Sequence, residues 1–387
     1  MGLRLKKAWP LILLLIAAAG LIMVFRPQPK QPVSAGIREA VLPSSNFKRA
    51  DGPRDFSFPA DFGPHPEFQT EWWYYTGSLS DDQGRQFGYQ LTFFRRALAA
   101  PSEVIQRESH WAASQVYLAH FTVSDIQNDR FHFWEQSARG AAGLAGATVD
   151  PTFEVWLYDW KVVQTGERTY QLFAEKEGIS LELSLEDAKG PILNGQEGYS
   201  RKGEGAGNAS YYISQTRLIS QGQLTLDGET FSVNGTSWMD HEFSTSVLSG
   251  DQVGWDWFSM QLDDGREILV YTIRHADGTL DPFSYGSLIL EDGSQKQLES
   301  RDFLIETTGT WMSEDSNTQY PSGWRVTIPD EKIDLEITPL MKDQELRVSY
   351  TYWEGAVQIT GTWDGQPVNG RGYVELTGYA ESMQGQF

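Results

Sequence analysis

The sequence predicts an all-β protein, in which a β-domain is duplicated behind an N-terminal hydrophobic segment. Three observations lead to this prediction. An aromatic hairpin motif occurs twice, about half the chain apart. Beyond residue 55, runs rich in β-branched and aromatic residues alternate with Asp-Gly and Asn-Gly turns, and helical periodicity is almost absent. Finally, an uncharged apolar run lies close to the N-terminus.

The apolar run extends over Trp9–Phe25 and follows a short basic segment. Its length is typical of a secretion signal or a short membrane anchor, and we expect residues 1–25 to be one of the two. Because basic flanks stay on the cytoplasmic side, the rest of the chain is expected outside the cytoplasm. For a bacterium this means a periplasmic location, membrane-anchored or secreted. Residues 26–54 contain Pro, Lys and Ser with little periodicity and are interpreted as a linker.

Composition excludes several classes of function. The net charge is −21, which repels phosphate backbones, so no nucleic-acid partner is expected. The chain has no cysteine, which excludes disulfides, thiolate metal sites and a cysteine nucleophile. It also lacks the motifs of serine hydrolases, kinases, dinucleotide-binding enzymes and zinc proteases. We expect no cofactor, and the sequence makes no prediction about protein partners.

The first repeat is the hairpin motif. Residues 71–96 are EWWYYTGSLSDDQGRQFGYQLTFFRR, and residues 254–275 are GWDWFSMQLDDGREILVYTIRH. Placing Trp72 on Trp255 also places Tyr74 on Trp257. In both copies an aromatic strand, an Asp/Gly turn and a second strand follow one another, which is the pattern of a β-hairpin.

A second repeat lies at the far end of each copy. Aligning the turns at residues 233–235 and 368–370 places Trp238 on Tyr373 and Asp240 on Glu375. Each domain therefore ends in a strand with an aromatic residue and, two positions later on the same face, a carboxylate. We place the domains at residues 55–245 and 246–387. Two stretches, Pro101–Trp111 and Asp240–Gly250, are the possible short helices.

Several motifs, in order along the chain, resemble one known family. They are FGPHPEFQTEWWYYTG, FGYQLTFFRR, GNASYYISQTRL, SWMDHEFS, WDWFSMQLDDGRE and RGYVELTGY. Together they resemble the AttH-like, carotenoid 1,2-hydratase (hydroxyneurosporene synthase) family of secreted proteins. The resemblance implies two tandem lipocalin-like antiparallel β-barrels. It also implies hydratases that add water across the terminal double bond of an acyclic carotenoid, beside many members loosely called hydrolases.

The run Trp238-Met239-Asp240-His241-Glu242 carries the densest group of reactive side chains. If it is a strand, Trp238, Asp240 and Glu242 share one face and His241 lies on the other. A carboxylate and an imidazole can act as acid and base. The alternative is a turn in which Asp240 caps the next segment and Trp238 fills the core. This spacing fits no recognised ligand set, and no metal site is expected.

Two further carboxylates are candidates for catalysis. Glu71 opens the first aromatic strand, and His65 is held between two prolines just before it. A carboxyl group among rings has a raised pKa and can donate a proton. The alternative is an edge glutamate and a packing histidine. Asp256 is predicted on the inner face of its strand, where it needs a partner, and Arg274 on the return strand is the candidate for a buried ion pair.

The aromatic candidates for ligand binding are Trp72, Trp73, Tyr74, Trp238, Trp255, Trp257 and Tyr271. Two hypotheses remain open. In the first, the protein is an enzyme that hydrates an apolar isoprenoid, with a neutral carboxylic acid as proton donor, aromatic faces around the cation and a histidine directing water. In the second, the protein is a non-catalytic carrier or sensor of a hydrophobic small molecule at the membrane surface.

Overall fold

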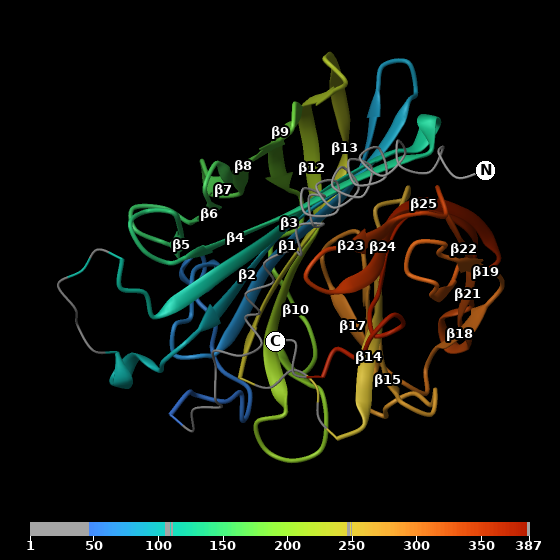
Figure 1. Ribbon diagram of the computed structural model, residues 1–387. Coiled ribbons are helices and arrows are strands. Elements are labelled where there is room, and N and C mark those ends of the chain that lie inside the picture. Colours follow the sequence, from blue (N-terminus) through green and yellow to red (C-terminus); the bar gives the residue numbers. More distant parts are fainter. Residues whose placement is uncertain (1–45, 105–108, 110, 246–247, 249, 385–387) are drawn as a thin grey trace, which may run out of the picture. The chain divides into compact units, whose positions relative to one another are not determined.

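The computed structural model describes residues 46–104, 109, 111–245, 248 and 250–384 (Figure 1). In this part of the chain the regular elements are β-strands and four short 3₁₀ turns, Ala60–Phe62, Pro101–Glu103, Ile126–Asn128 and Pro329–Glu331. The all-β prediction is therefore confirmed. The apolar run Trp9–Phe25 and most of the predicted linker lie outside the described residues. Within the described residues, no helix is long and apolar enough to cross a membrane.

The first sheet is an antiparallel meander that is nearly closed into a barrel. Its strands follow the order β4-β3-β2-β1-β13-β12-β9-β8-β7-β6-β5, and β5 and β6 come back against β3. Two short strands, β10 and β11, also pair with β12. The bounds are β1 Thr70–Asp81, β2 Gln86–Ala97, β3 Gln115–Asp125, β4 Arg130–Arg139, β5 Ala145–Thr148, β6 Glu154–Leu157, β7 Trp160–Gln164, β8 Thr169–Lys176, β9 Ile179–Asp187, β10 Ile192–Leu193, β11 Tyr199–Arg201, β12 Ala209–Leu226 and β13 Glu229–Ser244.

The second sheet repeats this antiparallel arrangement around its own core. Its order is β17-β16-β15-β14-β25-β24-β22-β21-β18, with β23 also paired to β24, whereas β19 and β20 form a separate two-stranded sheet. The bounds are β14 Gln252–Leu262, β15 Glu267–His275, β16 Tyr285–Ile289, β17 Gln295–Glu299, β18 Leu304–Thr307, β19 Thr310–Met312, β20 Gln319–Pro321, β21 Trp324–Ile328, β22 Ile333–Pro339, β23 Glu345–Arg347, β24 Thr351–Trp363 and β25 Gln366–Leu376. Below, the first barrel means β1–β13 and the second barrel means β14–β25.

The strand registers confirm the internal repeat. In the first barrel, β1 pairs with β13 and Tyr74 lies opposite Asp240. In the second barrel, β14 pairs with β25 and Trp257 lies opposite Glu375. These are the pairs that the two sequence repeats equate. The fold is a tandem double barrel, as expected from the duplication and the resemblance.

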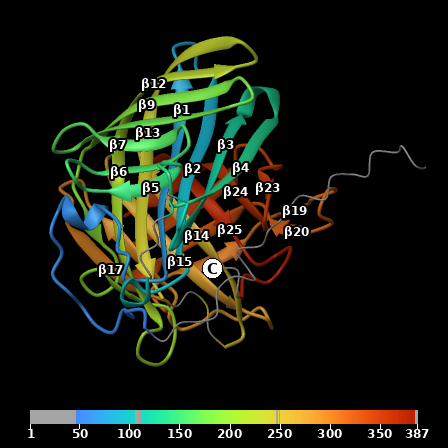
Figure 2. The ribbon, with the colours of Figure 1, turned by 60° about the vertical axis from the view of Figure 1, so that its left-hand side comes forward.

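The central strands of both barrels are buried on both faces. Along β1, Trp73 and Tyr75 point into the core of the first barrel, whereas Trp72 and Tyr74 point outward. The outward residues join outward residues of the second barrel, including Trp255 and Trp257, in a third apolar cluster. A strand with apolar side chains on consecutive positions is typical of burial on both faces. The two barrels therefore meet at the faces that carry these aromatic residues, with β1 close to β25 and β2 close to β24. Figure 2 shows the ribbons of both barrels from a second side.

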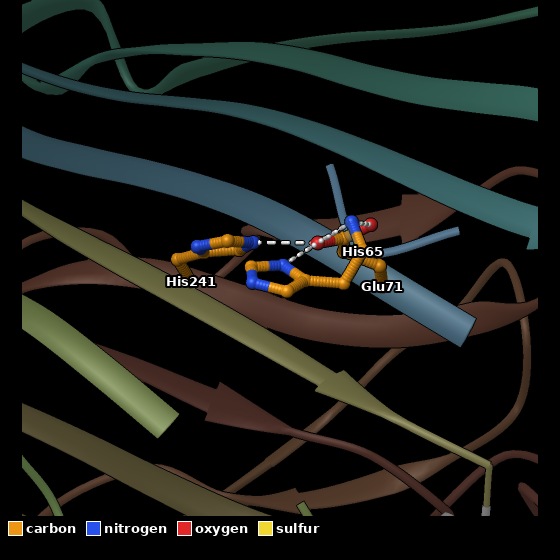
Figure 3. Close-up of side chains that lie close together, drawn as sticks. All are labelled: His65, Glu71 and His241. Atoms are coloured by element: carbon orange, nitrogen blue, oxygen red, sulfur yellow. Dashed lines mark hydrogen bonds and ion pairs between the residues drawn. The ribbon is translucent and has the colours of Figure 1, made fainter. Parts of the chain in front are cut away.

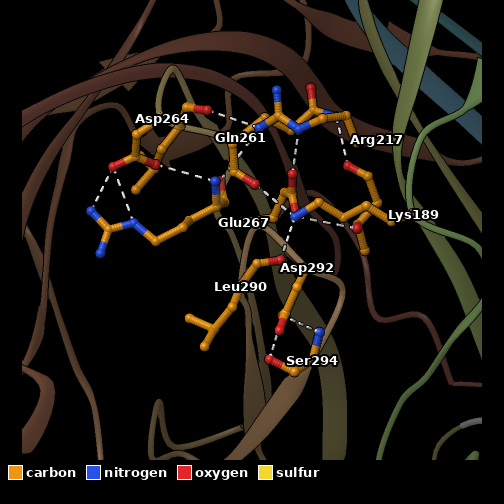
Figure 4. A network of polar contacts seen from close by, with 12 residues as sticks. Lys189, Arg217, Gln261, Asp264, Glu267, Leu290, Asp292 and Ser294 are labelled. Atoms are coloured by element: carbon orange, nitrogen blue, oxygen red, sulfur yellow. Dashed lines mark hydrogen bonds and ion pairs between the residues drawn. The ribbon is translucent and has the colours of Figure 1, made fainter.

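A buried ionic network also joins the barrels (Figure 4). Lys189, which follows β9, donates to Glu267 on β15 at 2.6 Å and to the carbonyls of Gly265 and Leu290. Arg217 of β12 donates to the other oxygen of Glu267. Glu267 is fully buried. Because isolated charges are costly in an interior, the two cations of the first barrel and the carboxylate of the second are paired with one another.

One of the two local helix predictions is wrong, and the described residues cover the other only in part. The stretch from Asp240 to Ser244 is not helical, because it continues β13. Here β13 is paired with β1 on one side and β12 on the other, and two ladders of backbone hydrogen bonds outweigh a weak helical preference. In Pro101–Trp111, the described residues form only the 3₁₀ turn Pro101–Glu103. The turn in which Asp240 caps a following segment is excluded by the same strand.

Candidate functional site

A cavity lies between the outward faces of the two barrels. Its volume is about 60 Å³, which is room for a few waters, since one water needs roughly 10–15 Å³. It is lined mostly by aromatic rings, with three carboxylates and one lysine among them. The lining residues are Trp72, Tyr74, Phe94, Lys202, Tyr212, Asp240, Glu242, Trp255, Trp257, Tyr271 and Glu375.

Asp240 of β13 contributes the most enclosed carboxyl group of the cavity. Its side chain accepts hydrogen bonds from Tyr212 Oη at 2.6 Å, from Trp238 Nε1 at 2.7 Å and from Ser214 Oγ. Burial raises the pKa of Asp240 to about 7, although these three donors act in the opposite direction. The group therefore gains or loses its proton near neutral pH.

Glu375 of β25 contributes the equivalent carboxyl group from the second barrel. It accepts one hydrogen bond, from Trp255 Nε1 at 2.7 Å. Burial raises the pKa of Glu375 to about 7, and the negative charges of Asp240 and Glu242 act in the same direction. Two carboxyl groups with perturbed pKa values thus face one cavity, which is a feature of functional sites.

An ion pair forms another part of the lining. Lys202 Nζ lies 3.1 Å from Glu242 Oε1, and both side chains are buried. The ammonium group also lies 4.2 Å from the centre of the Tyr271 ring, in a cation–π contact. Burial lowers the pKa of Lys202, and the charge of Glu242 opposes this shift.

Behind Tyr74 lies a further buried acid. Tyr74 of β1 donates its hydroxyl hydrogen to Glu354 Oε1 of β24, across the barrel interface. Glu354 is fully buried, and its Oε2 has no hydrogen-bond partner. Burial, together with the charge of Glu375, raises the pKa of Glu354 well above its usual range. Its surroundings therefore favour the protonated form of this carboxyl group.

The interior of the first barrel holds a separate polar cluster, formed by His65, Glu71 and His241 (Figure 3). Glu71 Oε1 lies 2.9 Å from His65 Nδ1 and 2.9 Å from His241 Nε2. Arg95 Nε donates to Glu71 Oε2 at 2.7 Å. Glu71, Arg95 and His241 are fully buried. Although burial opposes it, the charge of Arg95 and the bonds from both histidines hold the pKa of Glu71 well below its usual range.

Comparison with known proteins decides the family. The model of the AttH-like family matches residues 49–379. The chain belongs to the AttH-like family. A crystal structure of an AttH protein from Nitrosomonas europaea is 35% identical, with a TM-score of 0.76, covering 86% of this chain and 100% of that one. A search of curated proteins finds no match.

Two more distant structures share the fold of this AttH-like chain. Kievitone hydratase from Nectria haematococca is 15% identical, with a TM-score of 0.64, covering 88% of this chain and 98% of that one. A structure of CghA is 13% identical, with a TM-score of 0.51, covering 88% of this chain and 98% of that one. At these identities the likeness concerns the fold.

The predicted catalytic residues of this AttH-like protein fall into three places. Asp240 faces the cavity between the barrels, whereas His241 lies on the opposite face of the same strand, as the alternation predicts. Glu71, His65 and His241 meet inside the first barrel. The raised pKa expected for Glu71 is wrong, because Arg95 and the two histidines lower the pKa of its carboxyl group. Asp256 forms the expected ion pair, with Arg274 Nε at 2.9 Å, and also accepts from Tyr379 Oη at 3.0 Å.

The predicted ligand-binding residues divide as well. Those that line the cavity are Trp72, Tyr74, Trp255, Trp257 and Tyr271. Trp238 lies behind the lining and holds Asp240 through its indole nitrogen. Trp73 is elsewhere: it is fully buried in the first barrel, with its ring centre 5.0 Å from that of His241. Because successive side chains along β1 point to opposite faces of the sheet, Trp73 cannot share a face with Trp72 and Tyr74.

Sequence reasoning missed Glu375 and Lys202 as site residues. For Glu375 the signal was present, because the second repeat equates it with Asp240. For Lys202 the sequence contains no comparable signal: it lies after β11, in a Gly-rich connection, and reaches the cavity only through tertiary structure. No histidine is among the residues that line the cavity. Among the described lining residues, the groups that can exchange a proton are therefore the three carboxyl groups, Lys202 and the tyrosine hydroxyls.

Proposed function

We propose that this AttH-like protein protonates and hydrates a carbon–carbon double bond of an apolar ligand in the cavity between the barrels. The observation that carries the proposal is the pair of carboxyl groups, Asp240 and Glu375, each with a pKa of about 7 in a cavity lined by rings. A general acid works best when its pKa lies near the working pH.

The roles follow from the hydrogen bonds of the two acids. Three donors already surround Asp240, which favours its carboxylate form, whereas Glu375 accepts a single bond and takes the proton more readily. In the proposed step, Glu375 transfers its proton to one alkene carbon, and the other carbon becomes a cation. Water then adds its oxygen to that carbon and passes a proton to Asp240. A proton returned from Asp240 to Glu375 restores the starting state.

The aromatic lining supports the same chemistry. Faces of Trp and Tyr rings stabilise a nearby positive charge, here the carbocation. The cavity of about 60 Å³ accepts the small unsaturated end of a ligand and a water, with the remainder of the ligand outside. The occurrence of a hydratase, kievitone hydratase, on the same fold adds support.

An isotope experiment tests the proposal although the substrate is unidentified. The purified full chain is incubated with a bacterial membrane lipid extract in H₂¹⁸O, and products are identified by mass spectrometry. We expect an apolar compound that gains one H₂¹⁸O. Glu375→Gln keeps an acceptor for Trp255 but has no proton to donate, so it should abolish the product. Glu336→Gln, at an exposed position of β22, is the matched control. Equal turnover by Glu375→Gln would refute the assignment of the acid.

A carrier function is the second candidate, and one observation favours it. Each carboxyl group of the cavity already has a partner within the protein: Asp240 has three donors, Glu242 has Lys202, and Glu375 has Trp255. A carrier requires no free catalytic group. In the same experiment, a ligand that copurifies unchanged with both wild type and Glu375→Gln would favour this function over hydration.

We also propose that the protein acts outside the cytoplasm, either anchored by residues 1–25 or released after their removal. The basic flank and the apolar run of Trp9–Phe25 support this proposal. Cell fractionation and protease treatment of spheroplasts test it. Protection of the chain from external protease, with recovery in the cytosolic fraction, would contradict it.

A further inference from the structure

The cluster of His65, Glu71 and His241 joins three separate parts of the first barrel. His65 lies in the segment before β1, Glu71 is on β1 and His241 is on β13. The three potential ligand atoms, His65 Nδ1, Glu71 Oε1 and His241 Nε2, all lie within 4.8 Å of one another. Figure 3 shows the two rings directed at the same carboxylate oxygen. All three residues are buried.

The remaining ring nitrogens are held by oxygens of one residue. His65 Nε2 lies 3.0 Å from Asp61 Oδ1, and His241 Nδ1 lies 3.1 Å from the backbone carbonyl oxygen of Asp61. A histidine that binds a metal nearly always donates its other N–H to a carboxylate or a backbone carbonyl. Both histidines show this arrangement, which leaves His65 Nδ1 and His241 Nε2 for an ion.

The carboxylate is oriented by equally specific contacts. Arg95 Nε donates to Glu71 Oε2 at 2.7 Å, and the backbone N–H of His65 is shared between Oε2 at 3.0 Å and Oε1 at 3.1 Å. Oε1 is thereby directed at the two histidines. The ligands of a metal site are usually fixed by such outer contacts.

We propose that His65, Glu71 and His241 bind a divalent first-row transition metal ion of the zinc type. Two imidazoles and one carboxylate are a common protein ligand set for zinc, whereas calcium and magnesium prefer oxygen ligands alone. The site is closed and faces away from the cavity, so its role is structural. It fastens the segment before β1 to β1 and β13, whose opposite faces carry Trp72, Asp240 and Glu242.

Metal analysis of the refolded protein tests the proposal. The full chain is unfolded in denaturant with a chelator, refolded with or without Zn²⁺, desalted and analysed for metal. We expect about one zinc per chain, release of protons on zinc binding, and a higher Tm with zinc. His65→Gln and His241→Gln should each weaken zinc binding more than about 100-fold, because changes to outer contacts alone cost 10–100-fold. His132→Gln, on β4 outside the cluster, should bind as wild type.

A measurement on the wild type covers the case in which the variants do not fold. Refolding with Co²⁺ should give the visible absorption bands of a low-coordinate cobalt site with histidine ligands. Zinc retained equally by His65→Gln and His241→Gln would show an adventitious surface site and overturn the proposal. Wild-type protein that folds, shows no cobalt spectrum and retains no zinc would overturn it as well.

Discussion

Asp240 and Glu375 occupy the same position in the two barrels and face the same cavity. Asp240 lies opposite Tyr74 in the pairing of β13 with β1, and Glu375 lies opposite Trp257 in the pairing of β25 with β14. A duplicated strand has thus provided one acid from each copy. The donors around them differ, however, and the separate roles proposed for the two acids rest on this difference.

Glu375→Gln should change the pH dependence of stability. The pKa of Glu375 rises from 4.5 to about 7 on folding, so between these values the folded state holds a proton that the unfolded state has lost. Stability due to this group therefore falls as pH rises from about 4.5 to 7, by at most about 3 kcal/mol. The Tm of the variant should be higher than that of wild type at about pH 8, whereas the two Tm values should be nearly equal at about pH 4.5. Thermal unfolding at both pH values measures this, and a constant difference would contradict it.

Tyr74→Phe should destabilise the contact between the barrels. The hydroxyl of Tyr74 donates a hydrogen bond to the buried Glu354, whose second oxygen has no hydrogen-bond partner. Removing the hydroxyl takes a hydrogen bond from a buried carboxyl group, which should lower the free energy of unfolding by about 1–3 kcal/mol. Urea unfolding of Tyr74→Phe, Glu354→Gln and the double variant would show whether the two effects couple. Additive effects would mean that the bond contributes nothing.

Glu267→Gln should lower the free energy of unfolding far more than the loss of a surface carboxylate does. It leaves Lys189 and Arg217 without their shared counter-charge in a buried network, which costs about 3–5 kcal/mol. The matched control is Asp334→Asn, which breaks the exposed pair with Arg325 and should cost no more than about 1 kcal/mol. Denaturant unfolding compares the two. Similar losses would show that the buried network does not hold the barrels together.

Much of the fold was predictable, because its signals are local or repeated. Alternation along a strand predicted that Asp240 and His241 point to opposite faces, and it paired Asp256 with Arg274. The cavity between the barrels was harder to predict. The consecutive aromatics at residues 72–75 indicate burial on both faces, but not what covers the outer face. The cluster of His65, Glu71 and His241 depends on β1 pairing with β13, a contact far apart in sequence that no turn signal specifies.

The pH dependence of hydration should reveal the two acids together. Glu375 must carry a proton to donate it, so the rate should fall as pH rises above about 7, and Asp240 must be ionised to accept one, so the rate should fall below about 7. The expected profile is a bell with its maximum near pH 7, whose apparent pKa values belong to the coupled pair. Initial rates of ¹⁸O incorporation between about pH 5 and 9 measure it. Asp240→Asn should remove the acidic limb and lower the maximum about 10²–10⁴-fold, the usual contribution of a general base. A flat wild-type profile would contradict acid–base catalysis by these two groups.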